Sequence, residues 1–402
     1  MNTAAPSPAP APAYLTRAQE WALAVTTAVV TANAYYIHPI IGDVARGFGV
    51  GQATIGLVPA LNQLALALGI LLLLPLGDFY SNKRLCLIFV AGQTLCLGGM
   101  VLAPGFASFT AASTLLGFVT IAPYLIPAFA SKRVAPERLG QVTALLTAGV
   151  IFGILVARMG AGIIAEYADW HAVYVLALTL MAGVTAFLPI AMRSESAAPK
   201  RAGASYGALI GSVFTLAARH PDMRLSAAIQ GLNFATFTAS WLALALHLTS
   251  PALGYGTDDV GYLAGIAAVS LFTTPRLGRW ADQVGPRRAR VAAAVVQFVG
   301  IALFYPLGGS IAGVMVPLFI VNLVGPTIDV TGRMTLFALA PEIRTRLTTS
   351  YIVAMFIGGA LGSAAGTAVF DWGGWGATCA LLAAMSSAVL ALSFHAERVK
   401  PV

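Results

Sequence analysis

Five ionisable side chains lie within or beside long apolar stretches of this sequence. Arg158 interrupts one such run, Asp329 and Arg333 stand four residues apart in another, and His38 and Asp43 follow a third. A carboxylate or an imidazole at such a place can take up and release a proton, and a guanidinium can hold an anion. An arginine at the centre of a membrane helix costs about 2.5–3.5 kcal/mol on insertion scales. We therefore expect these side chains to face the protein interior or a wet cavity, and His38, Asp43, Asp329 and Arg333 are the candidates for proton coupling.

Helix geometry predicts which way Arg158 points. A stripe of glycines marks one face of the same predicted helix: Gly149, Gly153 and Gly160. At about 100° per residue, Arg158 lies roughly 150° from the centre of that stripe. Because glycines allow another helix to pack closely, the arginine is predicted to face away from that contact.

The partner of Arg158 is open between three hypotheses. Asp329 is predicted to lie about 16 Å from it in membrane depth, which is too far for a direct pair. Asp43 is nearer in depth. Arg158 therefore contacts Asp43, a bridging water, or an anionic group of a substrate.

The other charged residues also have plainer interpretations. The i, i+4 spacing of Asp329 and Arg333 permits a self-contained ion pair on one helix face, and Arg333 can instead reach the inner membrane interface. His38 stands next to Pro39 at the predicted membrane edge, which favours a solvated imidazole. For Asp329 and Arg333 the structural interpretation and the coupling role stay open together.

The elements that position these residues are predicted to be membrane-spanning helices. The 402 residues are 58% hydrophobic and only 9% charged, whereas a soluble protein carries about 25% charged residues. The mean hydropathy of +0.83 agrees. Strand alternation is absent, so the predicted fold class is an all-α integral membrane protein.

Twelve transmembrane helices are predicted, because a bilayer core of about 30 Å needs about 20 apolar residues. They cover residues 20–40, 54–76, 85–103, 108–130, 140–164, 171–191, 224–247, 259–276, 289–308, 312–337, 348–370 and 376–394. The first and the tenth are the least regular. The first drifts into the sequence YYIHPIIGD, and the tenth contains Asp329 and Arg333.

The orientation follows from lysine and arginine, which are concentrated in alternate loops and in both tails. The opposite set of predicted loops contains Arg46 as its basic residue. Positive loops face the cytoplasm, so both termini are predicted to be cytoplasmic in a bacterial inner membrane. The net charge of +8 is therefore a topology signal, and nucleic acid is not an expected partner.

A polar interruption divides the chain into two predicted lobes. The domains are a disordered tail at 1–19, a six-helix lobe at 20–191, a cytoplasmic linker at 192–222, a second six-helix lobe at 223–395 and a tail at 396–402. Within the linker, Tyr206 to Ala218 is predicted to form a short helix on the inner membrane surface. A monomer is expected.

The two lobes are predicted to be copies of one six-helix unit. Asp78 and Asp282 are 204 positions apart, Pro136 and Pro341 are 205 apart, and Trp170 and Trp375 are also 205 apart. Arg158 has no counterpart at the same offset, because Ser363 stands there. An asymmetry within a repeated frame favours a functional role for this arginine.

One loop motif connects the chain to a known family. Residues 278–288 read GRWADQVGPRR. Gly278 lets helices approach closely, Asp282 can accept hydrogen bonds from an arginine or a helix N-terminus, and Gly285 permits a tight turn. Arg287 and Arg288 can anchor the loop at the headgroups. The motif resembles the loop signature G-x-x-x-D-x-x-G-x-[RK]-[RK] of the major facilitator superfamily.

The resemblance implies a latch on the cytoplasmic side. The first copy, PLGDFYSNKR at 75–84, keeps an aspartate and two basic residues but lacks both glycines at their expected places. The gate candidates are Asp78, Lys83, Arg84, Glu137, Arg138, Gly278, Asp282, Gly285, Arg287, Arg288, Glu342 and Arg344.

The resemblance extends over the whole chain. The segments ANAYYIHPIIGDVARGFGV, GILVARMGAG and GGALGSAAG look like the bacterial drug:proton antiporter and sugar-efflux branch of the superfamily. That branch implies twelve spans, two pseudo-symmetric lobes, alternating access and export driven by proton entry. It also implies that spans one, four, seven and ten line the cavity, with two, five, eight and eleven beside them. The candidates for substrate binding are Asn33, Tyr36, Asn62, Gln63, Tyr124, Arg158, Asn233 and Trp241.

Competing functions are an importer that moves substrate together with protons on the same fold, and a membrane receptor or enzyme without transport. The segment GAGIIA at 160–165 mimics a dinucleotide fingerprint but follows no strand, and no ATP-binding loop or H-E-x-x-H motif occurs. Cys86, Cys96 and Cys379 lack metal-ligand spacing. The chain is predicted to be a transporter without enzyme activity, cofactor or metal, whose partners are a small-molecule substrate, protons and the lipid bilayer.

Overall fold

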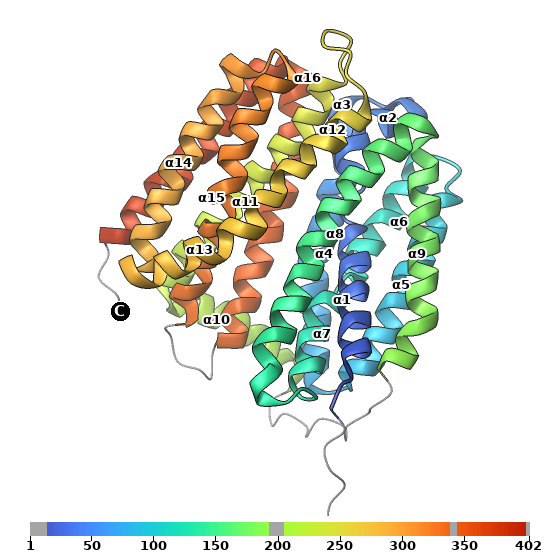
Figure 1. Cartoon of the computed structure of the whole chain (residues 1–402), viewed down its shortest axis with the longest axis vertical. Helices are drawn as coiled ribbons and strands as arrows, with labels where there is room; N and C mark the ends of the chain where they lie inside the picture. Colours follow the sequence, from blue (N-terminus) through green and yellow to red (C-terminus); the bar gives the residue numbers. More distant parts are fainter. Residues whose placement is uncertain (1–13, 193–204, 338–343, 399–402) are drawn as a thin grey trace, which may run out of the picture.

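The computed structural model describes residues 14–192, 205–337 and 344–398, and in these ranges it is helical without strands. Two bundles of helices stand side by side, one drawn in blue to green and the other in yellow to red (Figure 1). The predicted fold class of two six-helix lobes is confirmed.

The first lobe contains nine α-helices and two short 3₁₀ helices in the described residues. They are α1 (Arg17–Ala32), α2 (Ile37–Phe48), α3 (Gln52–Ile55), α4 (Leu57–Leu73), η1 (Leu74–Asp78), α5 (Asn82–Val101), α6 (Phe106–Val119), α7 (Ala122–Ser131), η2 (Pro136–Arg138), α8 (Leu139–Tyr167) and α9 (Trp170–Ala191).

The second part of the chain begins with the linker helix and continues through the second lobe. Its elements are α10 (Tyr206–Arg219), α11 (Pro221–Leu248), α12 (Thr257–Ala264), η3 (Gly265–Ala268), α13 (Val269–Val284), α14 (Pro286–Leu307), α15 (Ile311–Phe337) and α16 (Arg344–Arg398).

The twelve predicted spans correspond to these elements. Ten described stretches are long and apolar enough to cross a membrane. One of them lies in α16, whose 55 residues contain the last two predicted spans, joined at Gly374 with φ 62° and ψ −155°. The first predicted span is divided between α1 and α2, neither of which reaches 18 residues. Counting α16 as two spans and adding the span formed by α1 and α2 gives twelve.

The predicted bounds of the first span, 20–40, are wrong. The helix ends at Ala32, turns over residues 33–36, and resumes from Ile37 to Phe48. Pro39 has no backbone N–H for the carbonyl of Tyr35, so a regular helix cannot continue through this point. The bend changes the direction of the chain before α2. The position of His38 in the candidate site depends on this change of direction.

The linker helix α10 is present where the sequence predicts one. Its N-terminal Tyr206 hydroxyl donates a hydrogen bond to the carbonyl oxygen of Leu72, 2.5 Å away. The Ser350 hydroxyl on α16 donates to the carbonyl oxygen of Val213 at 3.0 Å. The helix therefore contacts both lobes, on the side of the molecule where α1 begins, here called the termini side (Figure 1).

Close packing of α8 on α1 confirms part of the predicted glycine stripe. A Cβ added to Gly149 would lie 2.6 Å from the carbonyl oxygen of Ala24, and one added to Gly153 would lie 2.2 Å from that of Ala28. The prediction is wrong for Gly160, where an added Cβ meets nothing within 4 Å. Helix α1 has ended at Ala32 and the chain bends, so the backbone of α1 does not continue along α8 to the level of Gly160.

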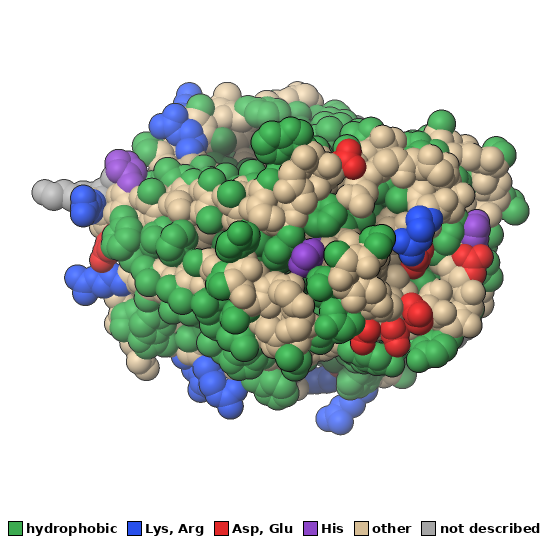
Figure 2. Space-filling view, turned by 90° about the horizontal axis from the view of Figure 1, so that it is seen from above, with side chains coloured by type: hydrophobic (Ala, Val, Ile, Leu, Met, Phe, Trp, Pro, Cys, Tyr) green, Lys and Arg blue, Asp and Glu red, His purple; other side chains and the backbone are tan. Residues whose placement is uncertain are grey.

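The lobes meet between α4 and α16 and, on the side opposite the termini side, between α8 and α12. The Glu166 carboxylate accepts hydrogen bonds from the backbone N–H and the hydroxyl of Thr257, at 2.9 and 3.2 Å. The same hydroxyl lies 3.2 Å from the carbonyl oxygen of Gly162. Figure 2 looks onto this side and shows Asp and Glu side chains gathered over one part of it. These bonds hold the two lobes together there.

Candidate functional site

A cavity of about 370 Å³ lies between the two lobes. Side chains from α1, α7, α11 and α15 line it, which are parts of spans one, four, seven and ten, and α8 and α16 contribute beside them. The lining residues that carry polar groups or aromatic rings are Thr31, Tyr35, Thr120, Tyr124, Gln230, Asn233, Phe234, Phe237, Gln297, Asn322, Asp329, Arg333 and Phe356. The cavity therefore combines aromatic rings, amides and one pair of opposite charges.

An amide cluster forms one wall of the cavity. The Asn233 side-chain nitrogen donates to Gln230 Oε1 at 3.2 Å, and Gln297 Nε2 donates to Asn233 Oδ1 at 2.9 Å. Asn322 donates to the carbonyl oxygen of Leu318 at 2.8 Å. Asn233 was predicted from the sequence. Gln230 lies three residues before it on the same helix face and could have been found by that spacing, whereas Gln297 is brought in by tertiary packing of α14.

A carboxylate–guanidinium pair lies on α15 and lines the cavity. Arg333 Nε donates to both oxygens of Asp329 at 3.1 Å. Tyr351 donates from its hydroxyl to the backbone carbonyl of Asp329 at 3.1 Å, and its ring lies 5.4 Å from the Arg333 guanidinium carbon. The self-contained i, i+4 pair is thus present, and it faces the cavity rather than lipid. Tyr124 also lines the cavity, as predicted.

Arg158 is enclosed by aromatic rings and an imidazole, and is 1% exposed. Its Nη2 lies 3.0 Å from His38 Nδ1. Its guanidinium carbon lies 5.3 Å from the ring centre of Tyr35, 4.8 Å from that of Phe237 and 4.4 Å from that of Trp241. Such contacts stabilise a cation away from water.

Two of the sequence hypotheses about this region are wrong. Asp43 is not the partner of Arg158, because Asp43 is paired with Arg46 one turn later on α2. His38 is not solvated, because its side chain is fully buried. Both corrections have one cause: the bend at residues 33–36 turns His38 toward α8 and leaves Asp43 beyond it.

The hydrogen bond between Arg158 and His38 determines the tautomer of the imidazole. A guanidinium can only donate, so Nδ1 of His38 accepts and its proton sits on Nε2. Within the described residues, Nε2 of His38 and Nε of Arg158 have no hydrogen-bond partner. Two buried N–H donors are therefore left without acceptors.

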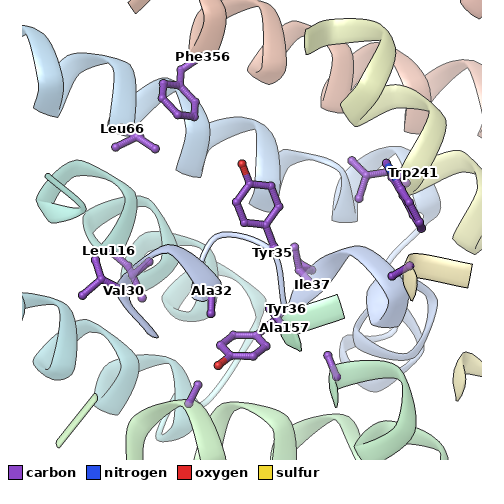
Figure 3. Close-up of a cluster of buried hydrophobic side chains, with 14 of the residues drawn as sticks. Val30, Ala32, Tyr35, Tyr36, Ile37, Leu66, Leu116, Ala157, Trp241 and Phe356 are labelled. Carbon is purple, nitrogen blue, oxygen red and sulfur yellow. The ribbon is translucent and has the colours of Figure 1, made fainter. Parts of the chain in front are cut away.

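This cluster joins the two lobes at the closed end of the cavity. Arg158, His38 and Tyr35 belong to the first lobe, and Phe237 and Trp241 belong to α11 in the second. Tyr35 and Phe237 also line the cavity. Figure 3 shows Tyr35 pointing into the space between the helices, with Trp241 across from it. We call these five residues the arginine clasp.

The remaining substrate-binding candidates do not line the cavity. The ring of Tyr36 points away from that of Tyr35 (Figure 3) and lines an apolar groove between α1 and α8. Asn62 donates to the carbonyl oxygen of Ser113 at 2.6 Å, which is a packing bond within the first lobe. Gln63 Oε1 lies against Gly359, where an added Cβ would be 1.9 Å away.

Asn33, the last of these candidates, lies at the bend after α1. It is buried, and neither of its amide atoms has a hydrogen-bond partner within the described residues.

The gate candidates lie on the termini side, in both lobes. Arg138 pairs with Glu20 at 2.6 Å, Arg287 with Asp222 at 2.7 Å, and Arg288 with Glu397 at 3.7 Å. Each of these three pairs stays within one lobe, so none of them latches the lobes together in this conformation.

Other gate candidates are placed as follows. Asp78, Glu137 and Asp282 are exposed, Lys83 and Arg84 lie in the first turn of α5, and Gly278 lies on α13. Gly285 has φ 94°, so the predicted tight turn is confirmed. Glu342 and the side chain of Arg344 lie outside the described residues.

Comparisons with known proteins place this geometry in a family. The family model described as Major Facilitator Superfamily matches residues 23–325. An uncharacterized transporter YgaY of Escherichia coli O157:H7 is 26% identical over 381 residues, covering 93% of this chain and 95% of that protein. A probable transporter SCO4007 of Streptomyces coelicolor is 27% identical over 385 residues, covering 94% and 86%.

Solved structures share the fold at low identity. The nucleoside transporter NupG superposes with a TM-score of 0.77 at 13% identity, covering 94% of this chain and 99% of that one. A bacterial homolog to the human lysosomal transporter Spinster, in an inward-facing and unoccupied conformation, gives a TM-score of 0.74 at 13% identity, covering 96% and 98%.

Proposed function

Because the chain belongs to the Major Facilitator Superfamily, a family of membrane transporters and not of enzymes, we propose that it exports a small amphipathic or polar molecule in exchange for protons. The cargo binds in the cavity between the lobes, and the lobes rock about it so that the cavity opens to one side of the membrane at a time. The protein works as a monomer in a bacterial inner membrane, with both termini in the cytoplasm.

The observation that carries this proposal is a carboxylate in the cavity wall. Asp329 is the one acidic residue among the lining side chains of the described chain, and Arg333 is its partner. A proton on Asp329 removes its charge and weakens the pair, which releases the guanidinium. In this proposal a cargo bound against the ionised pair and a proton on Asp329 exclude each other, as exchange requires.

The arrangement of the lobes supports loading from the cytoplasm. The lobes contact each other through α8 and α12 on the side opposite the termini and through α4 and α16, where Gly56 packs against Thr367. The basic loops lie on the termini side (Figure 1). Since positive loops face the cytoplasm, this conformation presents the cavity inward. An exporter picks up its cargo in that state.

Proton movement in everted membrane vesicles tests the proposal. A thermal-shift screen against antibiotics, sugars, amino acids and siderophores first selects a cargo. That cargo is then added to vesicles whose interior is acidified, while a pH-sensitive dye follows the interior. Exchange makes the interior less acidic; the competing importer, which carries cargo and proton together, makes it more acidic.

Two variants make the test specific. Asp329→Asn is expected to abolish the cargo-dependent pH change, because an amide cannot carry the proton. Asp43→Asn is the matched control, since Asp43 lies beyond the clasp and pairs with Arg46. Proton exchange at the wild-type rate in Asp329→Asn would refute the assignment.

A further inference from the structure

The charge of Arg158 is not balanced by a carboxylate. Within the described residues, no Asp or Glu oxygen lies within 4.0 Å of its guanidinium nitrogens, and its polar neighbour His38 is a neutral acceptor. The aromatic rings around it stabilise the cation but do not cancel its charge. A unit of positive charge therefore remains at the closed end of the cavity.

The cavity itself adds no net charge. Asp329 and Arg333 are the charged residues among its lining side chains in the described chain, and they cancel each other as a pair. The amide cluster is neutral. The field inside the cavity is therefore set by the pair's dipole and by the single positive charge of Arg158.

Only one layer of side chains separates that charge from the cavity. Tyr35 and Phe237 line the cavity on one face and lie about one ring thickness from Arg158 on the other, at 5.3 and 4.8 Å from ring centre to guanidinium carbon. The Nε–H group of Arg158 and the Nε2–H group of His38 have no acceptor within the described residues, so no anionic protein group offsets the charge there. Across that layer the guanidinium attracts an anion in the cavity and repels a cation.

The size of the effect follows from Coulomb's law. For a charge about 8 Å away at an effective dielectric constant of about 20, the interaction is about 2 kcal/mol, which is a factor of about 30 in affinity. A monoanion gains this factor relative to a neutral molecule of the same shape, and a monocation loses it.

The walls of the cavity indicate the body of the cargo. Aromatic rings line it from both lobes, among them Tyr35, Tyr124, Phe234 and Phe237, and the side-chain amides of Gln230 and Asn322 also line it. Flat rings stack on such walls. We propose that the cargo is a small planar aromatic monoanion, and that Arg158 supplies the charge that selects it.

This inference rests on the proposed function only in that the cavity binds the cargo. An anionic cargo also agrees with the proposed direction of transport, which is export. Moving one negative charge out of a cell with a negative interior is favoured by about 2.3 kcal/mol per 100 mV. Membrane potential therefore assists the export of an anion.

Binding of three probes that differ in charge tests the inference. The probes are naphthalene-2-carboxylate, 2-naphthamide and 2-naphthylmethylammonium, titrated into the purified full-length protein in detergent by calorimetry. The carboxylate is expected to bind more tightly than the ammonium. The ratio of the amide Kd to the carboxylate Kd is expected to fall about 30-fold in Arg158→Gln and to be kept in Arg158→Lys, which retains the charge.

The control is Arg46→Gln, which removes another arginine of the first lobe that is paired with Asp43 and largely exposed. It is expected to leave the ratio unchanged, and size-exclusion profiles show that each variant is folded. Failure of the carboxylate to bind, tighter binding of the ammonium, or an unchanged ratio in Arg158→Gln overturns the inference. These titrations need no proton movement, so charge selection without proton exchange in vesicles would refute the proposed coupling and leave this inference standing.

Discussion

Two glycines on α8 can test how closely α8 packs against α1. Gly153 lies in that contact, and Gly160 lies outside it and serves as the control. Gly153 lies against α1, and a methyl group there would meet the backbone carbonyl of Ala28 at 2.2 Å from its oxygen and 2.8 Å from its carbon. Backbone atoms cannot rotate away as a side chain does. Gly160 lies two turns further along the same helix, and a methyl group there meets nothing within 4 Å. Gly153→Ala and Gly160→Ala therefore add the same atom in opposite surroundings.

The two substitutions are expected to change the free energy of unfolding in opposite directions. To accept the methyl group of Gly153→Ala, α1 and α8 must separate by about 1 Å, and overpacking of this kind costs about 1–3 kcal/mol. Gly160→Ala meets no clash and gains helix propensity, worth about 0.8–1.0 kcal/mol. Gly153→Ala has the same propensity gain, so the two variants should differ by the overpacking cost alone, about 1–3 kcal/mol.

Thermal unfolding in detergent can measure this difference. Cys86 and Cys379 are buried, so a thiol-reactive dye reports their exposure as the protein unfolds. At about 2–4 °C per kcal/mol for an unfolding unit of roughly 150–250 residues, the size of one lobe, the apparent midpoint of Gly153→Ala should lie a few degrees below that of Gly160→Ala, and that of Gly160→Ala at or above that of the wild type. Equal midpoints for the two variants would show that α1 and α8 do not pack as described.

Three further substitutions probe the contacts between and within the lobes. Glu166→Ala removes the bonds to the start of α12, at about 1–3 kcal/mol; alkylation of a reporter cysteine at that helix start should speed up about tenfold, and an unchanged rate would count against the contact. Trp241→Leu removes a ring from Arg158, a contact worth about 2 kcal/mol when desolvated, and should increase the same alkylation severalfold; a slower reaction would contradict the clasp. Asn62→Ala removes the bond to Ser113 and should lower the melting temperature while cargo affinity stays within about twofold, and a large loss of affinity would instead place this side chain in the binding site.

Local properties of the sequence were enough to predict most of the architecture. Hydropathy over about 20 residues located the spans, and the short linker helix predicted from Tyr206 is present. The turn at Gly285 followed from the need for a positive φ. Asn233, Tyr124, Asp329 and Arg333 line the cavity, as polar residues at mid-depth of the expected spans should.

Residues that depend on the course of a neighbouring chain could not be placed in this way. Helical periodicity put Gly160 on the same face as Gly153, but it carries no information on where α1 ends. Hydropathy put His38 at the membrane edge, whereas the bend before α2 buries it against Arg158.

The sequence by itself therefore determined that this protein is a two-lobed bundle of membrane helices and that Arg158 is buried within it, because hydropathy and helical period are properties of one segment at a time. The tertiary structure alone decided what surrounds that arginine. His38 reaches it through a bend, and Phe237 and Trp241 reach it from the other lobe. Contacts between segments so far apart depend on how the whole bundle packs, and no single segment encodes them.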